Sequence, residues 1–124
     1  MLTTLATVLA GLLGAALIAM GAMVFAKPQN AAGFGIPDTP VADPAFRSWL
    51  HVKGAREIVC GIFMFVLILV APTSVLGWYV LTFAVMPIAD AVIVLRSGGP
   101  KATAYGVHAA TAAVMVATAI GLLL

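Results

Sequence analysis

Residues 53–71, KGAREIVCGIFMFVLILVA, place three charged side chains directly before an uninterrupted apolar run. The apolar part, Ile58 to Ala71, has 14 residues and would extend only ~21 Å as a helix. A bilayer core of ~30 Å requires about six residues more, and only His51 to Glu57 can supply them. A helix that crosses a membrane here must therefore draw Arg56 and Glu57 into the edge of the apolar slab.

The composition of the whole chain is typical of an integral membrane protein. Of its 124 residues, 64% are hydrophobic and 8% are charged, against about 25% charged in an average soluble domain. The mean hydropathy is +1.20, which leaves too little polar surface for a water-soluble fold. A net charge of +2, with no basic stripe that carries interleaved aromatic residues, gives no reason to expect a nucleic-acid partner.

Turn-forming residues divide the chain into four predicted membrane-spanning helices, a single all-α domain over residues 1–124. Three prolines between positions 28 and 40 forbid a long helix there, and Asp43 followed by Pro44 is a typical helix start. The expected helices cover about 3–26, 44–71, 75–95 and 102–124. Pro87 removes one backbone hydrogen bond from the third helix, which should bend near it.

All lysine and arginine residues belong to one side of the predicted integral membrane four-helix bundle, because they flank the first and third loops. They are Lys27, Arg47, Lys53, Arg56, Arg96 and Lys101. Basic residues mark the cytoplasmic side of membrane proteins. Both termini are therefore expected outside the cytoplasm. The expected location of the protein is a bacterial inner or plasma membrane. No basic residue precedes the first apolar run, so we interpret it as a retained helix rather than a signal peptide.

Ionisable side chains on three helices fall at one depth near the predicted cytoplasmic face. Glu57 lies about one to two turns inside the second helix. Asp90 lies ~9 Å from the basic end of the third helix, and His108 lies ~10 Å from the basic start of the fourth. Charged groups inside a membrane normally face the bundle interior and pair with one another. Asp90, Glu57 and His108 are therefore the candidate catalytic residues.

Three further side chains, Arg56, Tyr105 and His51, are candidate ligand-binding residues. We expect Arg56 to pair with a carboxylate, and Tyr105, one turn from His108, to lie on the same helix face. No metal is predicted and no cofactor is identified, because no ligand spacing such as HExxH occurs. The alternative is that the polar layer is a charge-neutralised network that only holds the helices together.

The first predicted helix is rich in small residues, which let another helix approach closely in lipid. They are Gly11, Gly14, Ala15, Ala19, Ala22 and Ala26. We interpret them as a packing surface within the bundle. The alternative is the contact face of a homo-oligomer.

Short motifs resemble those of a known family. Lys53-Gly-Ala-Arg56-Glu57 opens the second helix, Pro87-x-x-Asp90 lies late in the third, and His108-Ala-Ala lies early in the fourth. Over essentially its whole length the chain resembles the uncharacterised four-helix membrane protein family catalogued as domain of unknown function 4267, which occurs in actinobacteria and fungi. The resemblance implies a four-helix fold and no activity. A weaker likeness to DoxX-like membrane proteins rests on size and topology.

The leading interpretation of function is a site for a small lipophilic molecule near the cytoplasmic side, with acid–base chemistry of the isomerase or cyclase type. The expected partners are then the lipid bilayer and that ligand. One alternative is proton- or ion-coupled transport, which would need an oligomer, because the outer half of the bundle offers only Ser and Thr hydroxyls. Another is a structural partner subunit of a membrane complex.

Overall fold

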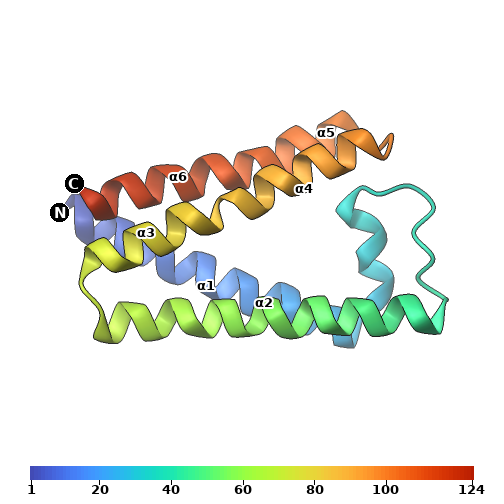
Figure 1. The fold of residues 1–124 in the computed structure, drawn as a ribbon, viewed down its shortest axis with the longest axis horizontal. Helices are drawn as coiled ribbons and strands as arrows, with labels where there is room; N and C mark the ends of the chain where they lie inside the picture. Colours follow the sequence, from blue (N-terminus) through green and yellow to red (C-terminus); the bar gives the residue numbers. More distant parts are fainter.

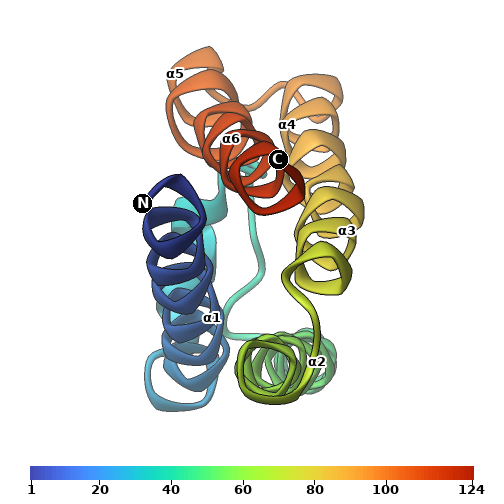
Figure 2. The same ribbon diagram turned by 90° about the vertical axis from the view of Figure 1, so that its left-hand side faces the viewer.

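The structure is a computed structural model that describes all 124 residues, and it contains helices and no strands. In chain order the elements are α1 (Leu2–Ala26), the 3-10 helix η1 (Pro28–Phe34), α2 (Pro44–Val70), α3 (Thr73–Phe83), α4 (Val85–Arg96), α5 (Lys101–Thr103), the π-helix η2 (Ala104–Ala109) and α6 (Ala110–Leu123). α3 and α4 follow one another in one direction, as do α5, η2 and α6, and consecutive rods run in opposite directions (Figures 1 and 2).

The rods are close together at one end of the molecule and diverge toward the other (Figure 1). Both termini lie at the close end, where α3 and the start of α1 pack on α6, and α1 approaches α2 further along its length (Figure 1). At the other end, the segment 28–43 lies between α2 on one side and α4 and α5 on the other (Figure 1). α2 and α4 make no extended contact with each other, so the segment 28–43 separates the two halves of the bundle there.

Glycines set the closest helix contact in the structure. A Cβ on Gly21 of α1 would lie 2.5 Å from the carbonyl oxygen of Gly54 of α2, and one on Gly61 would lie 2.6 Å from the carbonyl oxygen of Gly14. The two glycines on each helix are seven residues apart, so both pairs fall on one contact line between antiparallel helices. Small residues permit such an approach of two backbones. Gly14 therefore packs within the bundle, whereas Ala15, Ala19, Ala22 and Ala26 are exposed.

The core at the terminal end is apolar. It is built from small and aliphatic residues of α1, α2, α3 and α6, together with Ala84, which joins α3 to α4: Ala6, Ala10, Met64, Leu67, Leu76, Val80, Ala84, Met115, Ala119 and Leu122. The one buried hydroxyl of this region, that of Thr118, donates to the carbonyl of Val114 in its own helix at 2.8 Å. Polar groups are therefore concentrated at the opposite end, next to the segment 28–43.

The start of α2 follows the prediction from its sequence. Oδ1 of Asp43 accepts a hydrogen bond from the backbone N–H of Phe46 at 2.7 Å, and Pro44 occupies the first helical turn. The Arg47 side chain donates to the carbonyl of Val41 at 2.8 Å, which ties the preceding chain to the helix. The N-cap predicted at Asp43 is confirmed.

The helix from Thr73 to Arg96 is interrupted next to its internal proline. α3 ends at Phe83 and α4 begins at Val85, with Ala84 between them. Pro87 has no N–H to donate to the carbonyl of Phe83, four residues earlier, and its ring crowds that carbonyl. This break at Ala84, three residues before the proline, lies close to the position at which the sequence predicted a bend.

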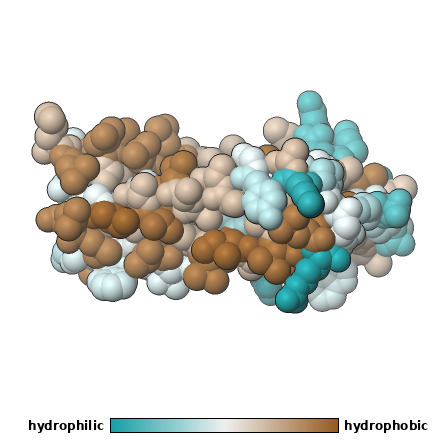
Figure 3. Space-filling model, turned by 90° about the horizontal axis from the view of Figure 1, so that it is seen from above, coloured by the Kyte–Doolittle hydropathy of each residue, from teal (hydrophilic) through white to brown (hydrophobic).

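Three helical stretches are long and apolar enough to cross a membrane: Leu2–Ala26, Thr73–Arg96 and Lys101–Leu123. α2 has 27 residues but carries Lys53, Arg56 and Glu57 within its length, and it is not one of the three. Hydrophobic residues cover most of the surface toward the terminal end, and hydrophilic residues gather toward the opposite end (Figure 3). The surface therefore changes from apolar to polar in the direction of the helix axes, from the terminal end to the opposite end.

Candidate functional site

Glu57 is the buried charge of α2. Only 8% of the residue is exposed. Its Oε1 atom forms an ion pair with Nζ of Lys53, one turn earlier, and this is the only ion pair in the structure. Its Oε2 atom is buried and has no hydrogen-bond partner. The Lys53 side chain is about half exposed, at 45%. Glu57 therefore keeps one oxygen unsatisfied inside the bundle, while its partner reaches toward the surface.

His108 lies in the π-helix η2 and is 8% exposed. Its Nε2 atom is 2.8 Å from the backbone carbonyl oxygen of Phe34, which can only accept a hydrogen bond. Nε2 therefore carries the proton and donates it, and Nδ1 is the basic nitrogen of the neutral ring. π-helical turns inside α-helices occur frequently at functional sites, and this one surrounds the only buried histidine.

Asp90 is the ionisable residue that α4 contributes to this region. It is half-buried, and the charges that act on it are those of His108, Lys53 and Glu57. We use the name polar cluster for four residues, Lys53, Glu57, Asp90 and His108. The polar cluster contains two carboxyl groups and one ammonium group. Glu57 and His108 are linked through Lys53 and Phe34, whereas Asp90 forms no hydrogen bond or ion pair with any member of the cluster and interacts with them only through charge.

Phe34 covers the polar cluster from the segment 28–43. Its ring centroid lies 5.6 Å from Nζ of Lys53, and its ring lies 4.5 Å from that of His108, tilted by 49°. The next residue, Gly35, has φ of 110°, a conformation that favours glycine, and it packs against Thr103. Two members of the polar cluster therefore hold Phe34 in place, one through its carbonyl and one through its ring.

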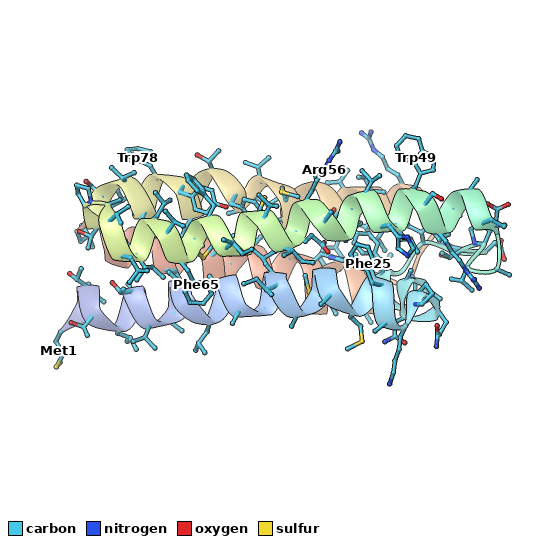
Figure 4. The ribbon with its side chains drawn as sticks, turned by 90° about the horizontal axis from the view of Figure 1, so that it is seen from below. Met1, Phe25, Trp49, Arg56, Phe65 and Trp78 are labelled. Carbon is cyan, nitrogen blue, oxygen red and sulfur yellow. The ribbon has the colours of Figure 1, made fainter.

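Two geometric expectations from the sequence are wrong. Arg56 forms no ion pair, is exposed, and points away from the bundle (Figure 4). It directly precedes Glu57 and so lies on another face of α2, whereas Lys53, one helical turn earlier, lies on the face of Glu57. Tyr105 does not share the face of His108: it is 59% exposed. The wide π-helical turn spaces residues differently around the axis than the α-helix assumed for the prediction.

His51 also lies outside the polar cluster. It is exposed and stacks on Phe25 of α1, with ring centroids 4.7 Å apart and ring planes 13° apart. No hydrogen bond or ion pair joins Arg56, Tyr105 or His51 to the four residues of the cluster. Their roles as ligand contacts stay predictions.

The sequence reasoning missed Lys53 and Phe34 as parts of the site. Lys53 could have been found, because charged residues four apart on a helix are neighbours. Phe34 carries no such signal. Its place depends on how the segment 28–43 folds back between the helices, which no local spacing encodes.

Two surface hollows are lined by residues other than those of the polar cluster. A groove of about 340 Å³ runs along α1, η2 and α6, and its lining is Leu13, Gly106, Val107, Ala110, Thr111 and Val114. A second hollow, of about 570 Å³, lies between the segment 28–43 and the turn after α4. Neither includes Glu57, Asp90 or His108. The structure contains no group of three or more His, Cys, Asp or Glu side chains arranged to hold a metal ion.

Comparison with known proteins identifies the family. No curated protein and no solved structure matches the chain. One protein family, described as a domain of unknown function, matches residues 14–122, a range that includes the whole polar cluster and its cover Phe34. The match spans far more than half of the 124 residues. The chain therefore belongs to the family described as Domain of unknown function (DUF4267).

Proposed function

We propose that the chain is an integral membrane protein of four helices whose polar cluster binds a small lipophilic molecule. The observation that carries this proposal is the Oε2 atom of Glu57, which is buried and has no hydrogen-bond partner. Buried polar atoms in native proteins nearly always have a partner, so an orphan in a native fold calls for a water, an ion or a ligand. A ligand group that donates a hydrogen bond to Oε2 would remove the cost of leaving it unsatisfied.

The membrane part of the proposal rests on three long apolar helices and on the position of α2 beside them. α2 has 27 residues, or ~40 Å of helix, and packs on α1. Trp49 and Trp78 lie near opposite ends of the bundle (Figure 4), as aromatic residues do at the two faces of a bilayer. The end with the basic residues would then face the cytoplasm, which puts the polar cluster at the cytoplasmic side of the apolar slab and both termini outside.

The polar cluster would also support acid–base chemistry of the isomerase or cyclase type. Because Nε2 of His108 donates to Phe34, the Nδ1 atom is left to accept a proton from a bound molecule. Asp90 or Glu57 in its acid form would return a proton at another position. A substrate from the lipid phase would reach these groups where α2 and α4 diverge, since the two helices make no extended contact.

Binding is favoured over transport because the polar groups are confined to one end of the bundle. The core between the polar cluster and the termini is made of alanine, leucine, valine and methionine side chains. Its one buried hydroxyl, that of Thr118, is already bonded within its own helix. The Tyr79 hydroxyl likewise donates to the carbonyl of Cys60, so a transported polar substrate would find no ionisable acid, base or free buried hydroxyl in this core.

A thermal-stability screen of the purified protein against neutral, cationic and anionic lipophilic metabolites tests the proposal. We expect at least one class to raise the Tm of the wild type and to lose this effect in both Glu57→Gln and Asp90→Asn. Asp38→Asn is a matched control, because it makes the same change on the exposed segment 28–43, where asparagine tolerates the φ of 54°. Identical responses of the wild type and both cluster variants would leave the polar cluster as a network that only joins helices.

A further inference from the structure

We infer that the ligand of the polar cluster carries an ammonium group, and that this group takes the place of Nζ of Lys53 between Glu57 and the ring of Phe34. The inference rests on the proposed function and names the chemical class of the ligand: a lipophilic amine. It starts from the position of the Lys53 ammonium, which forms an ion pair with Glu57 and lies 5.6 Å from the centroid of the Phe34 ring. A carboxylate and an aromatic face are together the groups that bind an organic cation.

Lys53 can vacate this position without a change in the fold. Its side chain is 45% exposed, whereas that of Glu57 is 10% exposed. A lysine near the edge of the apolar slab can extend its flexible chain toward water. The space that its ammonium leaves has the size and the partners of a ligand ammonium, so no separate empty cavity is required.

The hydrogen bonds of an amine fit the groups that lie around this position. A primary ammonium has three donors, and the Lys53 ammonium satisfies only one oxygen of Glu57. The second oxygen is buried and unpaired. Asp90 lies within electrostatic range of both Lys53 and Glu57. A ligand ammonium in this position would donate to both oxygens of Glu57, with the charge of Asp90 nearby.

The charges of the polar cluster also favour a cation. Two carboxylates face one ammonium group, and the Nε2 proton of His108 is engaged by a neutral carbonyl oxygen. Unpaired charges inside a membrane are costly and normally acquire a partner. A ligand monocation that replaces the Lys53 ammonium keeps this charge balance, and in addition it would donate a hydrogen bond to the unpaired Oε2 atom of Glu57.

The test measures the binding of octylamine, octanol and octanoate to the full chain in nanodiscs of zwitterionic phosphatidylcholine, with empty nanodiscs as the background. We expect octylamine to bind about tenfold or more tightly than octanol, the size of one hydrogen bond to a charged group. Glu57→Gln should remove this preference. Lys53→Gln should increase the affinity for octylamine, because it removes the intramolecular competitor while keeping a polar side chain that can still bond to Glu57.

Lys101→Gln is the matched control, because it removes a positive charge at the same end of the molecule outside the polar cluster and should leave the affinity unchanged. Equal gains in Lys53→Gln and Lys101→Gln would show a general charge effect and overturn the inference. If octanol binds as tightly as octylamine, and Glu57→Gln abolishes the binding of octanol, the ammonium inference is overturned. The proposed site for a lipophilic molecule is then retained. If none of the three probes binds above the background, both the inference and the proposed function fail.

Discussion

The imidazole of His108 and the backbone carbonyl of Phe34 are joined by a hydrogen bond of 2.8 Å although they lie 74 positions apart in the chain. It is the only side-chain hydrogen bond that links the segment 28–43 to the second half of the molecule. Because His108 is buried in the polar cluster, the segment that covers the open end of the bundle is attached to the candidate site itself.

His108→Phe should loosen the segment 28–43. The variant keeps a ring against Phe34 but removes the N–H donor, which costs about 1 kcal/mol and should make amide hydrogen exchange in residues 28–36 roughly fivefold faster. Exchange measured in detergent or nanodiscs would detect this. His51→Phe, a change of the exposed histidine at the same end, should leave exchange in the segment unchanged. Equal exchange in the wild type and His108→Phe would mean that the bond does not hold the segment.

Gly21→Ala should destabilise the bundle. The added Cβ would lie 2.5 Å from the carbonyl oxygen of Gly54, so α1 and α2 must move apart, at a cost of about 1–3 kcal/mol. Gly106→Ala is the control, because nothing lies within 4 Å of the added Cβ and alanine favours a helix by up to about 1 kcal/mol. Unfolding in mixed micelles, followed by circular dichroism, should separate the two variants. Equal stabilities would contradict the close helix contact.

Lys53 rather than Arg56 should be coupled to Glu57 in the free energy of unfolding. A double-mutant cycle with Lys53→Met and Glu57→Gln should give a coupling of about 0.5 kcal/mol, a modest value because the Lys53 side chain is half exposed. The same cycle with Arg56→Met should give about zero, since Arg56 has no ionic partner. A larger coupling for Arg56 would show that the ion pair is arranged differently in the membrane.

Both termini should lie outside the cytoplasm, because all lysine and arginine residues lie toward the other end of the bundle. Fusion of a reporter that is active only in the cytoplasm to either terminus should give no signal. The same reporter inserted after Gly98, in the turn between α4 and α5, should be active. Activity at one terminus and none at the inserted position would reverse the proposed orientation.

Local sequence patterns predicted those features that depend on neighbouring residues. Asp43 and Pro44 start α2 because the carboxylate caps the N–H groups of the first turn and proline needs no donor there. Pro87 interrupts its helix because it lacks an N–H. Counting residues along each helix, at a constant rise per residue, predicted one depth for Glu57, Asp90 and His108. The structure links two of them, Glu57 and His108, through Lys53 and Phe34.

Other features could not be predicted, because they depend on how helices rotate about their axes and how a loop folds back. An ideal α-helical period placed Tyr105 with His108, but the π-helical turn separates them. The pairing of Lys53 with Glu57, by contrast, follows from their four-residue spacing on one helix, and the sequence could have predicted it.

The sequence by itself determined that this protein is helical, apolar along most of its length and polar at one end, because hydropathy, helix rise and helix caps are local properties. The tertiary structure alone decided that Phe34 covers the polar cluster, that Gly14 and Gly21 contact Gly61 and Gly54, and that one oxygen of Glu57 is buried without a partner. Each of these results depends on contacts between segments distant in the chain, where close packing selects one arrangement among many that the same local patterns allow.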